Sequence, residues 1–280
     1  MSRELTYLQQ LERSVTKKYR RDIWNKFISA LQDYRLIDAG DRIAVCISGG
    51  KDSMLLAVLM RLLQQYSNIP FELVYLVMDP GYSPENRRLI EENAARLCLP
   101  IDVFDTDIFG IVDRAEKYPC YLCARMRRGH LYRAAMDRGC NKIALGHHMS
   151  DVIETTVMSM FYGSQLQCMA PRLRSSHFEG MELIRPLYRV HEDSIFAWQR
   201  YNGLQFLRCA CRATENIALC PDGVGDSKRA EVKALLRELR RSNPNIEKSI
   251  FHSIHDVHLD TFPGYRTHGE KYSFLDRYDD

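Results

Sequence analysis

The stretch from Ile43 to Leu56 constrains the fold of this chain more than any other, because it joins two apolar segments through a glycine-rich turn. Residues 43–47 are apolar and predict a buried strand, and the apolar run from Met54 predicts a helix. Between them lies Ser48-Gly49-Gly50-Lys51-Asp52-Ser53. Two glycines allow a sharp turn close to a ligand, and the first N–H groups of a helix point outward. The stretch therefore predicts a phosphate-binding loop.

The spacing of this loop excludes two common phosphate-binding motifs. A Walker A loop ending at Lys51 needs glycine at position 45 and serine or threonine at position 52, where the chain has Val45 and Asp52. The Gly-x-Gly-x-x-Gly dinucleotide pattern is also absent here. The loop resembles instead the SGGxDS pyrophosphate loop of the PP-loop ATPases. That resemblance implies cleavage of ATP between its α- and β-phosphates and adenylation of a substrate. The alternative, an ordinary glycine turn, is disfavoured by the order of strand, loop and helix.

Length and composition indicate an ordinary globular protein. With 280 residues, 45% of them hydrophobic and 27% charged, the chain can bury a sizeable core as one domain with additions. No apolar run approaches the roughly 20 residues that span a membrane, and the N-terminus lacks an apolar signal core. We therefore expect a cytoplasmic protein with no membrane partner.

Strand and helix patterns alternate along the middle of the chain. Strands are predicted at 43–47, 71–78, 101–104 and 142–145, with helices between them at 87–97 and 124–138. Such alternation is typical of an α/β fold with a doubly wound parallel sheet. Ligands of these sheets bind at the carboxyl ends of the strands. We expect Ser48–Ser53, Asp79 and the segment from Gly146 and His147 to Asp151 to line one edge.

Helical additions are predicted on both sides of this sheet. Residues 1–40 carry an apolar helical stripe that includes Trp24, Phe27 and Leu31. Further helices are expected at 192–201, 227–241 and 246–257, with 169–174 as a loop, a short strand at 183–184 and the tail from 258 as a surface extension. We therefore divide the chain into an N-terminal helical cap (1–40), a PP-loop ATPase domain (41–205) and a cysteine loop with C-terminal helices and tail (206–280).

The nine cysteines favour metal or redox chemistry over disulfides in a cytoplasmic chain, with buried inert thiols as the alternative. Cys120 and Cys123 form a Cys-x-x-Cys motif at a predicted helix start, which favours thiolates. Cys209 and Cys211 follow, with Cys220 further on. Cys-x-Cys fits a structural zinc knuckle poorly. Three thiolates on an iron–sulfur cluster would leave one iron without a protein ligand.

Other polar residues are each open to two interpretations. His147 and His148 could donate to a phosphate, and Asp151 could hold Mg²⁺ or only cap a helix. Arg127 follows the Cys-x-x-Cys motif, where a solvated helix face is the default. The net charge is only +3, so basic clusters matter more than the whole-chain balance. We predict that the following contact RNA phosphates unless they are merely solvated surface: Lys17, Lys18, Arg20, Arg21, Arg125 and Arg128.

Several motifs together resemble the tRNA 2-thiocytidine synthetase family, from about residue 20 to about residue 257. They are Ser48–Ser53, the segment from Cys120 and Cys123 to Tyr132, Ala144–Asp151, Met160–Gly163, Met169-x-Pro-Arg172, Ile184–Leu187 and a downstream cysteine pair. The resemblance implies an adenine nucleotide alpha hydrolase-like fold, an oxygen-sensitive [4Fe-4S] cluster, ATP with Mg²⁺, and sulfuration of an anticodon-loop cytidine of tRNA, with position 32 as the expected site.

The same resemblance implies roles for individual residues. The loop Ser48, Gly49, Gly50, Lys51, Asp52 and Ser53 would bind ATP phosphates, with Asp79, Gly146 and His147 at the nucleotide. Cys120 and Cys123 would be cluster ligands. Asp52 and Asp151 would act at the metal-bound triphosphate, and Arg127 stands where related thiolases carry a catalytic basic residue. The expected partners are tRNA, a sulfur donor such as a cysteine desulfurase, and a second copy in a homodimer.

The downstream cysteines depart from the family pattern, which is Cys-x-x-Cys rather than Cys209-x-Cys211. We predict Cys209 as the third cluster ligand, Cys211 as the next candidate and Cys220 as a structural thiol. Three rival functions stay open: a PP-loop thiolase for another tRNA base, a small-molecule PP-loop ligase with structural zinc, and a nucleotide-binding module that senses oxygen or iron.

Overall fold

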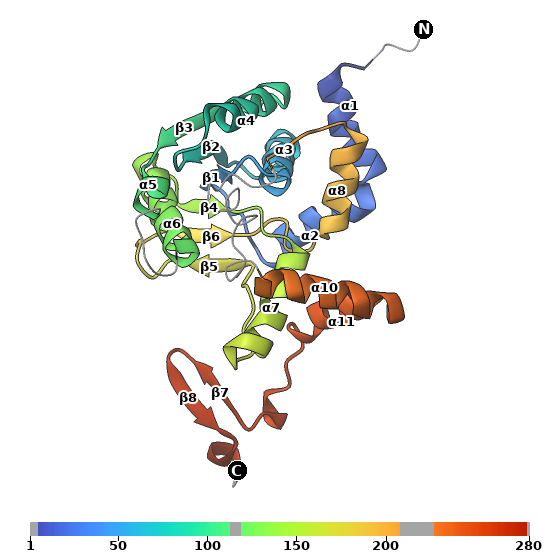
Figure 1. Ribbon diagram of the computed structural model, residues 1–280, viewed down its shortest axis with the longest axis vertical. Coiled ribbons are helices and arrows are strands. Elements are labelled where there is room, and N and C mark those ends of the chain that lie inside the picture. Colours follow the sequence, from blue (N-terminus) through green and yellow to red (C-terminus); the bar gives the residue numbers. More distant parts are fainter. Residues whose placement is uncertain (1–4, 113–118, 208–226, 279–280) are drawn as a thin grey trace.

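A computed structural model describes residues 5–112, 119–207 and 227–278 of the chain. Its centre is a six-stranded sheet with strand order β3-β2-β1-β4-β6-β5, in which only β5 runs antiparallel to its neighbour (Figure 1). The predicted doubly wound parallel sheet is therefore confirmed. The strands of this sheet are β1 (Arg42–Ile47), β2 (Glu72–Asp79), β3 (Ile101–Asp105), β4 (Lys142–Ala144), β5 (Arg172–Arg174) and β6 (Glu182–Ile184).

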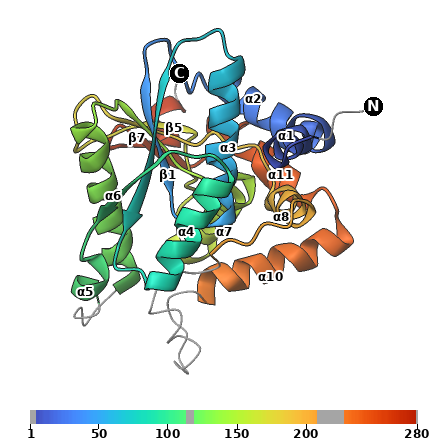
Figure 2. The ribbon, with the colours of Figure 1, turned by 90° about the horizontal axis from the view of Figure 1, so that it is seen from above.

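Helices cover both faces of the sheet (Figure 2). Among the described residues, no helix combines the length and the apolar character that crossing a bilayer requires. The helices around the sheet are α3 (Lys51–Tyr66), α4 (Pro84–Arg96), α5 (Ile108–Val112), α6 (Pro119–Asp137), α7 (Met149–Gly163) and α8 (Glu192–Tyr201).

Strand β1 shows why the sheet is buried on both sides. Ile43, Val45 and Ile47 pack in the main core with α3 and α8, whereas Ala44 and Cys46 pack on the opposite face with residues of α6. Alternate residues of a strand point to opposite faces, so a strand that is apolar at every position must be covered twice. The continuous apolar run before the loop thus dictates a three-layer fold.

The strand order locates the functional edge. The chain winds in opposite directions on the two sides of the β1–β4 pair, so the loops after β1 and β4 leave a crevice between them. The glycine-rich loop follows β1 and Gly146 and His147 follow β4. The predicted meeting of these two segments at one edge is confirmed.

The N-terminal segment is helical, as predicted, but two turns of it have π geometry. Phe27 is fully buried and Leu31 nearly so, which confirms the predicted apolar stripe. A buried Trp198 of α8 donates an indole hydrogen bond of 3.1 Å to Ser14 Oγ, and this ties the segment to α8. The segment consists of α1 (Tyr7–Arg13), η1 (Ser14–Lys18), η2 (Arg20–Trp24) and α2 (Asn25–Asp33).

The C-terminal part packs on α7 through two helices, with Val232, Leu236 and Phe251 buried against it. Beyond them, the tail forms a two-stranded hairpin that the sequence analysis did not predict. These elements are α10 (Ser227–Ser242), α11 (Ile246–Ser253), η3 (Leu259–Thr261), β7 (Gly264–Thr267), β8 (Glu270–Ser273) and η4 (Phe274–Arg277).

Three further expectations were wrong. Residues 172–174 form strand β5 rather than a loop, because Leu173 pairs with Leu183 and the Arg172 guanidinium bonds Glu182 across the strands. Helix α6 begins at Pro119 instead of 124, since proline is favoured in the first helical turn. The short helix α5 lies in a segment that was expected to be a loop.

Candidate functional site

The loop between β1 and α3 is held in shape by its own residues. Gly49 has φ of 81°, in the left-handed region that favours glycine, and a Cβ there would lie 2.7 Å from a side-chain carbon of Ile90. Ser53 Oγ accepts the Ser48 N–H at 3.1 Å and donates to the Gly50 carbonyl at 3.0 Å. Gly50, the N-cap, has no side chain to satisfy the first N–H groups of α3, so these groups can receive an anion.

Gly146 brings the β4–α7 turn directly against this loop. A Cβ at this position would lie 3.0 Å from both the carbonyl carbon of Asp52 and the backbone nitrogen of Ser53. Real Cβ atoms do not approach the backbone so closely without displacing it. Glycine at position 146 therefore lets the two turns lie in close contact, and a larger residue would push the loop backbone away.

Lys51 lies at the centre of a group of charges. Its ammonium group is 3.0 Å from Asp52 Oδ2 and 3.0 Å from Glu192 Oε1 at the start of α8. Burial lowers the pKa of Lys51, but the two carboxylates outweigh it, so the pKa is raised and the lysine stays charged. Burial of Glu192 would raise the pKa of its carboxyl group. Its cationic neighbours, above all Lys51, outweigh burial and lower this pKa to about 2.

His148 and Asp151 fix the start of α7 and also face the loop. His148 Nδ1 accepts the Asp151 N–H at 3.3 Å, and Asp151 Oδ2 accepts the His148 N–H at 3.0 Å, which is a reciprocal capping box. The other ring nitrogen of His148 lies 3.6 Å from Asp52 Oδ1. Asp151 thus does cap its helix, while its second oxygen faces Arg229 at 3.4 Å.

His147 is a poor candidate for a cationic phosphate ligand. Burial is the main cause that lowers its pKa to about 4, so the ring is neutral near pH 7. Its Nδ1 is buried and has no hydrogen-bond partner among the described residues. A neutral ring with an unsatisfied nitrogen can still exchange a single hydrogen bond with a ligand.

Glu154 extends the charged group toward α10. It is only 3% exposed and lies 3.5 Å from Lys233 Nζ and 3.6 Å from Arg229 Nε. Lys233 also lies 3.3 Å from Glu192 Oε2. Burial raises the pKa of Glu154 to about 7, although Lys233 and Arg229 oppose this. The sequence analysis did not predict Glu154, Glu192, Arg229 or Lys233 in the site, because no local motif marks them.

Asp79 lies at the same edge but is engaged in its own turn. Its Oδ1 accepts the N–H groups of Gly81 at 2.8 Å and Tyr82 at 2.7 Å, and its Oδ2 pairs with Arg87 at 3.2 Å. Tyr82 in turn donates to the Ser48 carbonyl at 3.4 Å. The geometry therefore gives Asp79 a positioning role beside the loop.

Helix α6 carries the Cys-x-x-Cys motif and Arg127. Cys120 and Cys123 are three residues apart on one helix, so they lie on the same face. Cys123 is partly buried and packs beside Met78, at the carboxyl end of β2. The Arg127 guanidinium lies 5.5 Å from the ring centre of Phe109, and its buried Nε has no hydrogen-bond partner among the described residues.

The remaining cysteines narrow the choice of thiolate ligands. Cys46 and Cys140 are buried in the core, where burial raises the pKa of Cys46 to about 12 and also raises that of Cys140. Neither is a ligand candidate. Cys209, Cys211 and Cys220 lie outside the described residues. Within the described part of the chain, no three His, Cys, Asp or Glu side chains gather in a metal-binding arrangement.

The cysteines of α6 are still compatible with an iron–sulfur cluster. Cys123 packs at the carboxyl end of β2, and Cys120 precedes it by three residues on the same helix, so α6 carries two of the three cysteines that such a site needs. For Mg²⁺, Asp52 Oδ1 and Glu154 Oε2 are buried oxygens without a hydrogen-bond partner among the described residues. Hard oxygen donors suit this ion, which also takes ligands from substrate phosphates.

Comparison with known proteins agrees with this arrangement. A family model for the PP-loop domain matches residues 19–217. The chain is 36% identical over 239 residues to the tRNA-cytidine(32) 2-sulfurtransferase of Geotalea uraniireducens, which covers 84% of this chain and 91% of the relative. It is 37% identical over 254 residues to the protein of that name from Alkalilimnicola ehrlichii. This match covers 88% of this chain and 75% of the relative.

A solved structure has a similar fold. It is the U34-tRNA thiolase NcsA from Methanococcus maripaludis with its [4Fe-4S] cluster, and it superposes with a TM-score of 0.65. The match covers 87% of this chain and 80% of that one, at 18% sequence identity. At this level of identity, the likeness establishes the fold.

The contact at Gly146 gives a first test of the site. We expect Gly146→Ala to displace the loop and to lower kcat/KM for ATP on the order of 100-fold, because small displacements of binding groups have large effects on rate. ATP affinity and turnover would be measured with the purified full chain. Gly129→Ala is the matched control, since a Cβ at Gly129 meets no atom within 4 Å. Equal ATP kinetics in the two variants would contradict the proposed contact.

The buried Glu154 predicts a pH dependence of stability. Its pKa is about 7 in the folded protein and near 4.5 in the unfolded chain, so the folded state holds the proton more tightly between these values. Stability should therefore fall as pH rises from 4.5 to 7, by on the order of 3 kcal/mol from this group.

Glu154→Gln cannot ionise and should lack this fall. Urea unfolding at pH 5 and pH 8 would show the stability of the variant, relative to the unchanged protein, rising with pH. Glu238→Gln, at an exposed position of α10, is the control and should follow the unchanged protein. Parallel pH profiles for Glu154→Gln and the unchanged protein would exclude a raised pKa at Glu154.

Proposed function

This chain belongs to the tRNA-cytidine(32) 2-sulfurtransferase family of PP-loop proteins, and we propose that it uses ATP to replace O2 of cytidine 32 in tRNA with sulfur. The observation that carries the proposal is the pyrophosphate loop Ser48–Ser53 with Lys51 at the centre of a group of charges. A half-buried cation beside outward-facing helix N–H groups suits a nucleoside triphosphate.

The first half of the reaction is adenylation. O2 of the cytidine attacks the α-phosphorus of ATP, and pyrophosphate leaves. The N–H groups at the start of α3 and the Lys51 ammonium group would bind the phosphates and neutralise the charge that develops on the leaving group. In this structure Glu192 forms an ion pair with Lys51, and on ATP binding Lys51 would exchange this partner for the phosphates. His147 and Gly146 would border the nucleotide from the β4–α7 turn.

The second half is displacement by sulfur. A sulfur nucleophile attacks C2 of the adenylated cytidine, and AMP departs with the former O2. Arg127, whose buried Nε has no hydrogen-bond partner in the part of the chain that the structure describes, would stabilise the departing AMP or the phosphate before it. Arg127 lies one turn after Cys123 on α6, which supports a role for this cation near a sulfur carried by the cysteines.

Two cofactors complete the proposal. Cys120, Cys123 and either Cys209 or Cys211 would hold a [4Fe-4S] cluster, which would supply the chemistry of sulfur delivery when bound. Asp52 and Asp151 would hold Mg²⁺, which would offset the negative charge of the triphosphate. We further propose a cysteine desulfurase as the source of sulfur, a cytoplasmic location and a homodimer.

The reaction products test the assignment. The purified protein with ATP, a sulfide source and unmodified tRNA should form AMP and pyrophosphate in step with 2-thiocytidine, as measured by nucleotide chromatography and nucleoside mass spectrometry. Lys51→Met should lower the rate on the order of 10²–10³-fold, because it removes a charge aimed at the phosphates. Lys271→Met, an exposed lysine of β8, is the control. ADP and phosphate as products would exclude the pyrophosphate mechanism, and sulfur on a base other than cytidine would exclude the substrate.

The cysteine assignment predicts which thiols hold iron. After anaerobic purification, Cys120→Ser and Cys123→Ser should each lose most iron and acid-labile sulfide, and Cys209→Ser should do the same. Cys98→Ser, at an exposed position beyond α4, should keep both. If Cys211→Ser loses iron and sulfide and Cys209→Ser keeps them, the third ligand is Cys211 instead of Cys209. Full cluster content in all four ligand variants would exclude the cluster from these positions.

A further inference from the structure

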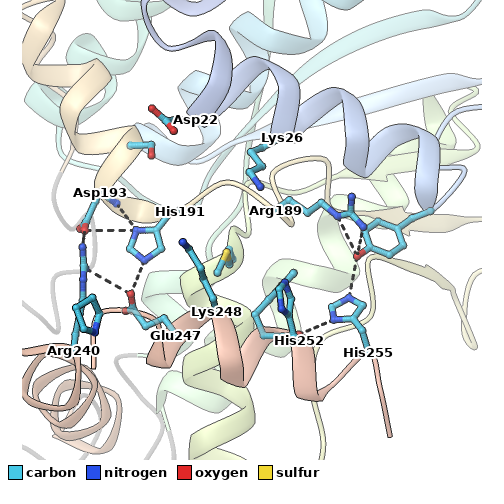
Figure 3. Close-up of a pocket in the computed structure, with 15 residues that line it drawn as sticks. Asp22, Lys26, Arg189, His191, Asp193, Arg240, Glu247, Lys248, His252 and His255 are labelled. Carbon is cyan, nitrogen blue, oxygen red and sulfur yellow. Dashed lines mark hydrogen bonds and ion pairs between the residues drawn. The ribbon is translucent and has the colours of Figure 1, made fainter. Parts of the chain in front are cut away.

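A groove with a volume of about 840 Å³ lies outside the phosphate loop, between α2, the start of α8 and α11 (Figure 3). We name it the α2–α11 groove. The polar and cationic residues that line it include Lys26, Tyr34, Arg189, His191, Lys248 and His252. None of them belongs to the motifs that the sequence analysis selected. Their side chains come from three separate parts of the chain.

One end of the groove neutralises its own charges. His191 Nε2 lies 2.9 Å from Glu247 Oε2, and Arg240 lies 2.6 Å from Asp193 Oδ2 and 3.6 Å from Glu247 Oε2. These carboxylates therefore already have cationic partners. The charges of the groove that remain are those of Asp22, which is exposed, and of the cations at the other end.

The other end is rich in cations with few anionic partners. Lys26 and Lys248 are exposed and form no ion pair with any described residue. The Arg189 guanidinium bonds Asp33 and lies 3.4 Å from the Tyr34 hydroxyl. Figure 3 shows Lys26 reaching from α2 and Lys248 from α11 toward the same space, with Arg189 and His252 beside it.

We propose that the α2–α11 groove binds the phosphodiester backbone of the tRNA substrate. This inference rests on the proposed function and assigns it a second contact surface. Lysines on flexible stems bind phosphates as point charges without reading sequence, which suits an RNA backbone. The uncapped N–H groups at the start of α3, which suit a nucleoside triphosphate, belong to the phosphate loop, whose residues do not line this groove.

The groove and the phosphate loop both border the first turn of α8. His191 and Asp193 line the groove, while Glu192 between them contacts Lys51 of the phosphate loop. An RNA whose backbone occupies the groove would thus pass beside the loop where ATP is expected. An acidic protein could meet the same cations, but the position next to the nucleotide site favours the RNA substrate.

The test is the salt dependence of tRNA binding by the full-length protein. Lys26→Gln/Lys248→Gln should weaken the binding of unmodified tRNA on the order of tenfold and reduce the slope of log K against log salt by about 1.5 to 2, since each lysine releases close to one counterion. The KM for tRNA should rise while kcat and the KM for ATP stay unchanged. Lys271→Gln, in the distant hairpin, controls for the loss of one surface charge.

A variant of opposite sign sharpens the test. Asp22 also lines the groove and is exposed, so Asp22→Asn should strengthen tRNA binding. Unchanged tRNA affinity and salt slope in the double lysine variant would overturn the proposal, and so would a loss of ATP affinity, which would assign the groove to a nucleotide or free phosphate.

These outcomes are separable from failure of the proposed function. If the unchanged protein forms 2-thiocytidine and the double variant does so with the same KM for tRNA, the proposed role of the groove is wrong, while the proposed function is supported. If the unchanged protein forms no 2-thiocytidine, the proposed function is wrong. The salt dependence of tRNA binding, measured by filter binding, then still decides whether the groove binds tRNA.

Discussion

The site depends on a chain of alternating charges that starts at Lys51. Lys51 contacts Glu192, Glu192 contacts Lys233, and Lys233 contacts Glu154. Each of these side chains is at least partly buried, and a buried charge that loses its partner is strongly destabilising. The network therefore holds the starts of α8 and α10 against the phosphate loop. It also prepares the loop for its ligand, because phosphate oxygens can take the places that carboxylates occupy here.

Local pattern was sufficient to predict every strand of the sheet except β5, together with the glycine-rich turn between β1 and α3. The apolar run 43–47 and the helix after it occupy β1 and α3, since both are buried over nearly their whole length and need no distant partner to be recognised. The meeting of Ser48–Ser53 with His148 and Asp151 followed from one rule, that parallel strands present their carboxyl ends together. This rule needs only the order of the elements.

The residues that the sequence analysis missed reach the site by tertiary packing. Glu192 and Lys233 lie more than 130 residues beyond the loop along the chain, on helices whose positions depend on the docking of α8 and α10. A glutamate at a helix start looks like any residue that favours the helix dipole. Strand β5 was missed for a related reason, because its two arginines resemble a loop until Glu182 is placed opposite them.

The first turn of α8 explains how one short helix serves three surfaces. Successive residues of a helix point about 100° apart, so neighbours in sequence face different surroundings. Asp193 faces Arg240 across the groove, Glu192 faces Lys51, and the buried Ile195 and Trp198 fasten the helix to the core. Any ligand that draws Glu192 away from Lys51 acts on the same turn that carries His191 and Asp193. Because Ile195 and Trp198 anchor this helix in the core, the same packing positions Glu192 at the nucleotide site and Asp193 in the groove.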